Sequence, residues 1–159
     1  ALRDGTLNNI GADHSTVVPR KDKVGDGIWS AIPGFPMTGC SLPVMLHVAV
    51  HTGRLTFERL VELTSYNVAK AYGLLPQKGD IAPGFDADIV LVDLEKVRHV
   101  TPEIWHSDAD WSLYDGWDLK GWPVRTIVRG VTVALDGEIT GTQEHGRYIP
   151  RNIPKKPAA

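Results

Sequence analysis

Residues 8–14 read Asn8-Asn9-Ile10-Gly11-Ala12-Asp13-His14, and the other segments of the chain are best understood in relation to this stretch. An apolar position precedes a Gly-Ala step, and a carboxylate and an imidazole follow at once. We therefore expect a short strand from Leu7 to Ala12, with Asp13 at its carboxyl end. In barrel enzymes the strand fixes the backbone there, while the side chain projects into the barrel mouth. Asp13 could then bind a metal, take up a proton, or do both; the alternative is that Asp13 and His14 form a turn or a helix cap.

Composition and charge narrow the class of protein without giving its function. The chain has 159 residues, of which 42% are hydrophobic and 23% are charged, as in a globular domain with one modest core. The formal net charge of −2 predicts no nucleic-acid partner, because nucleic-acid binding needs a basic surface. The single cysteine, Cys40, excludes an intrachain disulfide and is typical of a reducing compartment. Without a signal peptide or an apolar run near ~18 residues, we expect a cytoplasmic protein with no membrane segment.

Several further motifs follow in order along the chain. They are Ile32-Pro33-Gly34-Phe35-Pro36 and the segments Leu63 to Leu74, Lys78 to Val90 and Leu119 to Val124. Together with the segment from Leu2 to His14, they resemble the cyclic amidases of the amidohydrolase superfamily: hydantoinases, dihydropyrimidinases and allantoinases. The resemblance implies an α/β fold, in which a (β/α)8 barrel holds two divalent metals and a small β-sandwich lies beside it.

A complete barrel needs ~250 residues, so the resemblance implies that this chain is the C-terminal part of a longer enzyme. We expect residues 1–75 to hold the last strand, the active-site loop and the last helices of the barrel. Residues 76–142 would hold strands of the β-sandwich with a surface crossover, and residues 143–159 an extended tail. The start without methionine, inside a motif, also suggests a truncated piece.

The activity that the resemblance implies is metal-dependent hydrolysis of a C–N bond in a cyclic amide of the hydantoin, dihydropyrimidine or allantoin type. Asp13 would be a ligand of one metal, usually zinc, and also the catalytic residue that accepts and returns a proton. His14 would support the site without binding the metal. The other ligands in the family come from earlier strands, so we expect these 159 residues alone to be inactive and to bind zinc weakly.

Residues 15–39 are predicted to form a long loop over the barrel mouth, ordered by burial of apolar side chains that include Trp29 and Ile32. In the family the equivalent loop holds the cyclic imide largely through backbone groups, and the matching residues here are Ile32, Pro33 and Gly34. Pro33 departs from the pattern, because many relatives have Asn there and proline has no backbone N–H to donate.

The resemblance also implies a homo-oligomer, commonly a tetramer, that binds a small cyclic amide or ureide. Two other classes of protein remain open. One is a non-catalytic dihydropyrimidinase-like protein that serves as an interaction or scaffold protein, and the presence of Asp13 favours the enzyme over it. The other is a small stand-alone binding domain, whose helices and hairpin would have to form a core without a barrel.

Three helices are predicted after the loop. The first runs from Ser41 to Thr52, where Ser41 can act as the cap. His47 and His51 stand four residues apart on it, as in a zinc motif, but Val48 occupies the position of the general-base Glu. We therefore interpret the two histidines as core or interface residues.

The second helix has Thr56 as its cap, and the third runs from Ser65 to Tyr72 with Val68, Ala71 and Tyr72 facing inward. Both are interpreted as structural.

Strands are predicted from residue 87 onward. The β-branched run from Ala87 to Asp93 indicates a buried strand, flanked by Asp86 and Asp88 in a structural rather than an acid/base role. Residues 93–121 should cross the surface, anchored by Trp105, Trp111 and Trp117. A hairpin follows, with strands at residues 124–128 and 131–135, a two-residue turn, and a second turn at residues 136–137.

Overall fold

The computed structural model of this chain describes residues 1–15 and 19–151, and it contains helices and one sheet, as an α/β protein does. The chain forms two compact units, each built from segments that are separate in sequence. Unit 1 comprises Ala1–Ile10, Arg54–Val92 and Pro123–Ala159. Unit 2 comprises Gly11–Gly53 and Asp93–Trp122.

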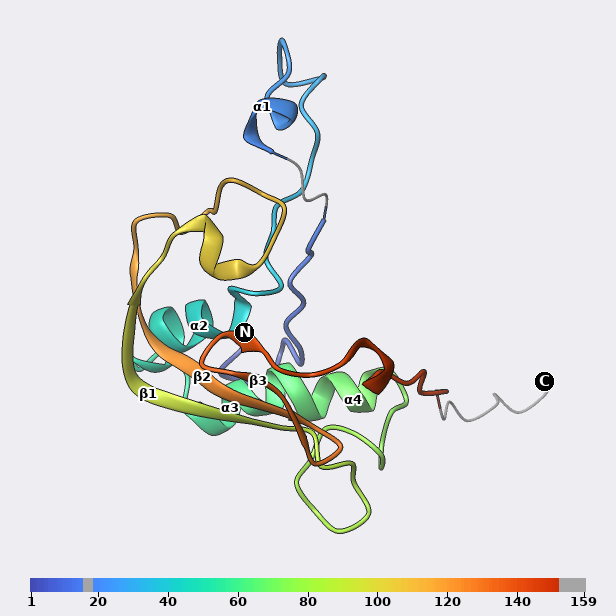
Figure 1. Cartoon of the computed structure of the whole chain (residues 1–159). Coiled ribbons are helices and arrows are strands. Elements are labelled where there is room, and N and C mark those ends of the chain that lie inside the picture. The colour runs from blue at the N-terminus through green and yellow to red at the C-terminus, as the bar shows by residue number, and fades with distance from the viewer. Residues whose placement is uncertain (16–18, 152–159) are drawn as a thin grey trace, which may run out of the picture. The chain divides into compact units, whose positions relative to one another are not determined.

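The sheet has four strands in the order β1-β2-β3-β4, and Figure 1 shows β1, β2 and β3 as neighbouring ribbons. Their bounds are β1 (Ile89–His99), β2 (Asp118–Val128), β3 (Val131–Leu135) and β4 (Glu138–Ile139).

The predicted hairpin is confirmed in its turn and pairing, but β2 begins at Asp118 rather than at residue 124, inside the predicted surface crossover. β2 and β3 pair antiparallel, and Val128 lies opposite Val131. The turn residues Arg129 and Gly130 have φ angles of 47° and 80°, as a two-residue turn with a matching twist requires. The second predicted turn leads from β3 into β4, which also pair antiparallel.

A strand is present where one was predicted at residues 87–93, but the prediction that it is buried is wrong. β1 begins at Ile89 and continues to His99, and its side chains are largely exposed; Val90 and Leu91 each expose 46% of their surface. A run of β-branched residues indicates a strand, but burial also requires a layer packed on each face of the sheet.

Unit 1 contains one continuous helical stretch where two separate helices were predicted. It consists of α3 (Phe57–Val61), the π-helical segment η2 (Glu62–Tyr66) and α4 (Asn67–Ala71), which form one unbroken coil in Figure 1. The Thr56 side chain accepts a hydrogen bond from the Arg59 N–H at 3.1 Å, so the predicted cap is confirmed. The buried residues are Leu60, Leu63 and Ala69, whereas Ala71 and Tyr72 are exposed, contrary to the prediction.

Unit 2 contains the predicted helix after the loop, as α2 (Ser41–Met45) followed by the π-helical segment η1 (Leu46–Val50). Cys40 rather than Ser41 is its cap residue, and Gly53 follows its last turn with a φ of 70°. The core of this unit consists of Cys40, Val44, Val100, Leu119 and Trp122.

The tryptophan anchors of unit 2 differ from those predicted. Trp105, at the end of η3 (Pro102–Trp105), packs on the core as expected and stacks on Trp122 with ring centroids 5.5 Å apart. Trp117, by contrast, is 45% exposed. Trp122 was missed because it lies inside a strand, where periodicity does not distinguish it from its neighbours.

The strand predicted from Leu7 to Ala12 is absent, since these residues have no regular secondary structure. The Ile10 N–H donates to the Leu63 carbonyl at 3.0 Å, within unit 1. A barrel strand needs a paired neighbour to hold its backbone, and no other strand precedes β1 among the described residues.

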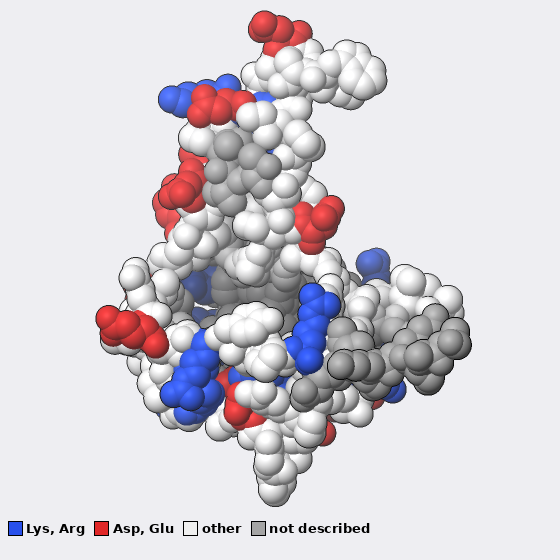
Figure 2. Space-filling view, turned by 90° about the vertical axis from the view of Figure 1, so that its right-hand side faces the viewer, with Lys and Arg blue, Asp and Glu red and all other residues white. Residues whose placement is uncertain are grey.

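The long loop contains a single turn of helix, α1 (Arg20–Lys23), and a last short helix, η4 (Gln143–His145), follows the sheet. Trp29 is 98% exposed, so the predicted burial of this loop residue is wrong. No helix of the described residues is both long and apolar enough to cross a bilayer. On the face drawn in Figure 2, basic and acidic side chains stand in small separate groups among uncharged ones.

Candidate active site

Asp13 has an uncommon backbone conformation. Its φ is 49°, in the left-handed region that non-glycine residues seldom adopt and that Asp tolerates better than most. The residue is exposed, so its carboxylate oxygens are accessible to a ligand. Backbone conformations of this kind are often found at functional sites.

His14 connects the segment of Asp13 to the long loop. Its Nδ1 accepts hydrogen bonds from the Met37 N–H at 3.0 Å and the Thr38 N–H at 3.2 Å. Because Nδ1 is an acceptor, the neutral ring carries its proton on Nε2. The Nδ1 atom is thus engaged by the backbone, which fits a supporting residue better than a metal ligand bound through that nitrogen.

Ser15 and Gly34 bring the two predicted site segments side by side. The Ser15 N–H donates to the Phe35 carbonyl at 3.4 Å. Gly34 has a φ of 98°, and a Cβ added there would lie 2.6 Å from the Ser15 Cβ. Unit 2 therefore places Asp13 and His14 next to the loop of Ile32, Pro33 and Gly34, although about twenty residues separate them in sequence.

Lys23 occupies most of the backbone groups of that loop. Its Nζ donates to the Ile32 carbonyl at 2.8 Å and to the Gly34 carbonyl, while its own carbonyl accepts from the Ile32 N–H at 3.3 Å. The Pro33 carbonyl and the Gly34 N–H have no hydrogen-bond partner among the described residues. These two groups belong to one trans peptide bond, so they point in opposite directions. The loop can therefore present one of them to a given edge of a ligand.

Lys23 was missed by the reasoning from sequence. It lies in a loop of mixed charges, where no spacing marks one lysine among the others. Gly34 carried the one usable signal, because a glycine in a loop often marks a close approach of two backbones.

The described residues do not form a complete metal centre. Asp13 fits one position, since a carboxylate oxygen is a common ligand of zinc and of harder divalent ions. No group of three or more His, Cys, Asp or Glu side chains is placed to hold an ion within residues 1–15 and 19–151.

The two histidines of the first predicted helix lie against the start of β2. His47 Nδ1 accepts from the Lys120 N–H at 3.2 Å, and His51 Nε2 lies near Gly121, where an added Cβ would be 3.3 Å away. These contacts favour the interpretation of both as packing residues.

Asp86 and Asp88 are engaged by one lysine. Lys78 Nζ lies 2.8 Å from Asp86 Oδ2 and also bonds Asp88, whose other oxygen accepts from the Arg129 N–H at 2.8 Å. Hydrogen bonds from Lys78 and Gln77 lower the pKa of Asp86 below its ordinary value. The pair thus ties the start of β1 to the hairpin turn, as a structural role predicts.

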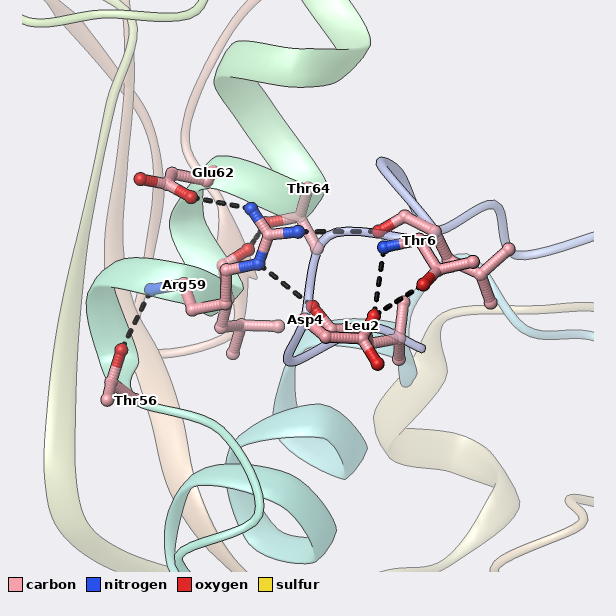
Figure 3. Close-up of polar contacts among 9 residues, drawn as sticks. Leu2, Asp4, Thr6, Thr56, Arg59, Glu62 and Thr64 are labelled. Atoms are coloured by element: carbon pink, nitrogen blue, oxygen red, sulfur yellow. Dashed lines mark hydrogen bonds and ion pairs between the residues drawn. The ribbon is translucent and has the colours of Figure 1, made fainter.

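Arg59 holds the segment that leads toward Asp13. Its Nε donates to the Leu2 carbonyl at 2.9 Å, its Nη2 to the Leu7 carbonyl at 3.3 Å, and its Nη1 pairs with Glu62 at 2.7 Å (Figure 3). Close by, the hydroxyl and the N–H of Thr6 donate to Asp4 and lower the pKa of that carboxyl to about 2. Residues 2–7 are therefore fixed on α3 within unit 1.

Comparison with known proteins shows the family. The sequence matches the amidohydrolase family over residues 22–133, which is more than half of the chain. The chain belongs to the amidohydrolase family. This assignment confirms the resemblance inferred from the ordered motifs.

Its relatives within the amidohydrolase family are hydantoinases and dihydropyrimidinases. D-phenylhydantoinase of Escherichia coli O1:K1 / APEC is 36% identical over 152 residues, which are 94% of this chain and 33% of the relative. L-hydantoinase (dihydropyrimidinase) from Arthrobacter aurescens is 40% identical, with a TM-score of 0.75 over 78% of this chain and 28% of that one. Dihydropyrimidinase from Brevibacillus agri NCHU1002 is 30% identical, with a TM-score of 0.89 over 94% of this chain and 33% of that one. The chain thus spans about a third of the length of the relatives that it matches.

Proposed function

We propose that this chain is the C-terminal part of a cyclic amidase, which hydrolyses a C–N bond in a ring of the hydantoin, dihydropyrimidine or allantoin type. The observation that carries the proposal is the contact of His14, next to Asp13, with the loop of residues 32–38, in a chain similar to a D-phenylhydantoinase along 94% of its length. In this proposal residues 1–75 belong to a (β/α)8 barrel, residues 76–142 to a β-sandwich and residues 143–159 to a tail.

Asp13 is the catalytic residue and a metal ligand in this proposal. A pair of divalent metal ions, zinc in the first instance, would lower the pKa of a water molecule so that it attacks at neutral pH. The Asp13 carboxylate has two oxygens, and the one that is not bound to metal can take up a proton and give it to the leaving ring nitrogen. His14 keeps this segment on the loop through its Nδ1.

The Pro33–Gly34 peptide is the proposed substrate contact. A cyclic amide presents N–H and C=O groups at its edge, and a peptide group can pair with either. Because Lys23 engages the groups of Ile32, the role assigned to residues 32–34 narrows to the peptide between Pro33 and Gly34.

The remaining metal ligands must come from a longer polypeptide in this proposal. Exposed apolar side chains in unit 1 support a longer polypeptide that covers them, because soluble proteins seldom leave many large apolar residues uncovered. They include Val61, Tyr72, Ile81, Val90, Leu91 and Ile139. We further propose a cytoplasmic location and a homotetramer; the free thiol of Cys40 is compatible with the former.

The test is hydrolysis by the complete polypeptide that contains this chain. It would be loaded with zinc and assayed with hydantoin, dihydrouracil and allantoin, beside the isolated 159 residues. We expect ring opening of at least one substrate by the complete polypeptide, and neither activity nor tight binding of two zinc ions by the isolated chain. A folded, metal-loaded polypeptide that opens none of these rings would support a non-catalytic scaffold protein instead.

A further inference from the structure

The long loop is held by an unusual set of contacts at Lys23. Its ammonium donates to two alternate carbonyls, those of Ile32 and Gly34, and lies 5.1 Å from the centre of the Trp111 ring. No carboxylate of the described residues forms an ion pair with it. A lysine normally reaches a carboxylate or water, so a half-buried ammonium on two main-chain oxygens fixes backbone rather than balancing charge.

The helix that carries Lys23 is itself anchored. The Arg20 N–H, at the start of α1, donates to Asp110 Oδ1 at 2.7 Å, next to Trp111. Segment 110–111, helix α1 and residues 32–34 are thus joined by consecutive contacts within unit 2. The Lys23 ammonium makes the contact that reaches residues 32–34.

The two carbonyls bound by Lys23 lie on either side of the Pro33–Gly34 peptide. With the carbonyls of Ile32 and Gly34 fixed, the rotation of the peptide between them is limited as well, because each residue has only two free dihedrals and Pro33 has one. We propose that Lys23 is a positioning residue, which orders residues 32–34 so that the Pro33–Gly34 peptide is oriented for the cyclic amide. This inference rests on the proposed function, since it names what sets the geometry of the substrate loop.

A positioning role predicts weaker substrate binding with little change in the chemical step. A mutation that removes an interaction present equally in the ground state and the transition state raises KM and leaves kcat nearly unchanged. Lys23→Met removes the ammonium and keeps the apolar stem. Lys23→Arg keeps a cation with several N–H donors. Lys21→Met is the matched control, because Lys21 is an exposed lysine of the same helix turn.

The experiment uses the complete, zinc-loaded polypeptide and two measurements. The first is the amide hydrogen exchange of residues 30–36, which needs no activity. The second is KM and kcat for the best substrate of the wild type. For Lys23→Met we expect exchange at least about tenfold faster, KM raised by about tenfold or more, and kcat within about threefold. Lys23→Arg should recover most of both effects, and Lys21→Met should match the wild type.

The outcomes separate this inference from the proposed function. A wild type that opens no cyclic amide overturns the proposed function, and with it the role of Lys23 toward substrate. An active wild type with a Lys23→Met variant of unchanged loop exchange and KM overturns the inference alone. A fall in kcat without a change in KM would also overturn it. Thermal unfolding of each variant identifies a general loss of folding, in which case the Lys23→Arg variant decides.

Discussion

Gly34 leaves no room for a side chain in the loop proposed to contact the substrate. Its positive φ disfavours any other residue, and Ser15 fills the space where a Cβ would lie. The proposed site therefore depends on a residue without a side chain, Gly34, whose proposed role is carried out by its peptide group.

Replacement of Gly34 by alanine should displace the loop. Gly84→Ala is a matched control, because its φ of 99° is nearly the same and nothing lies within 4 Å of an added Cβ. We expect Gly34→Ala to destabilise the chain by about 1 kcal/mol more than Gly84→Ala in urea unfolding. The double variant Ser15→Gly/Gly34→Ala should recover the difference; equal effects of the two single glycine variants would refute the steric argument.

The Lys78 cluster predicts a pH dependence of stability. Since Lys78 lowers the pKa of Asp86 below 3.8, its contribution is present above that value and is lost as the pH falls through the lowered pKa. Although desolvation opposes it, the hydrogen bonds that Lys78 donates to Asp86 and Asp88 raise the pKa of Lys78 above 10.5, so the contribution is lost again as the pH rises through the raised value.

Urea unfolding of the wild type and of Lys78→Met tests this dependence. The stability difference should be constant between about pH 5 and pH 9 and should shrink in stronger acid or base. Lys70→Met, at an exposed position of α4, is the control. A difference that persists unchanged at about pH 2 would rule out Asp86 as the partner.

At the scale of elements, features set by neighbouring residues were predicted more reliably than features set by packing. The cap at Thr56 and the turn at Arg129-Gly130 were predicted because each depends on two or three neighbouring residues. The join of α3, η2 and α4 into one helix, and the exposure of β1, depend on what packs against them. The individual hydrogen bonds of His14 and Ser15 to the loop at residues 35–38 were likewise beyond the sequence, because backbone hydrogen bonds between distant segments leave no periodic signal.

Helix α3 should lose its hold on the N-terminal segment when Arg59 is changed. Arg59→Lys keeps the charge but not the fork of donors that reaches Leu2, Leu7 and Glu62 at once. We expect the amides of residues 2–7 to exchange at least about tenfold faster in this variant, with a loss of stability of about 1 kcal/mol. Arg125→Lys, at an exposed position of β2, is the control; slow exchange in Arg59→Lys would mean that other contacts hold the segment.

At the scale of the whole molecule, the ordered motifs identified the family and the structure added the contacts between them. The family assignment rests on a match over residues 22–133, which no single motif could give. In the proposed site the described residues supply one carboxylate, one supporting imidazole and one loop peptide, so the proposed function requires residues outside this chain.

The central claim is that Asp13 performs the chemistry, and the most direct measurement is kcat of the complete, metal-loaded polypeptide with Asp13→Asn. Asparagine keeps the shape and the tolerance of a left-handed backbone but cannot take up the proton. The account predicts a fall in kcat of at least about 10²-fold, whereas Asp26→Asn, at an exposed position of the long loop that follows, should leave kcat unchanged. A wild-type kcat in Asp13→Asn would contradict the account.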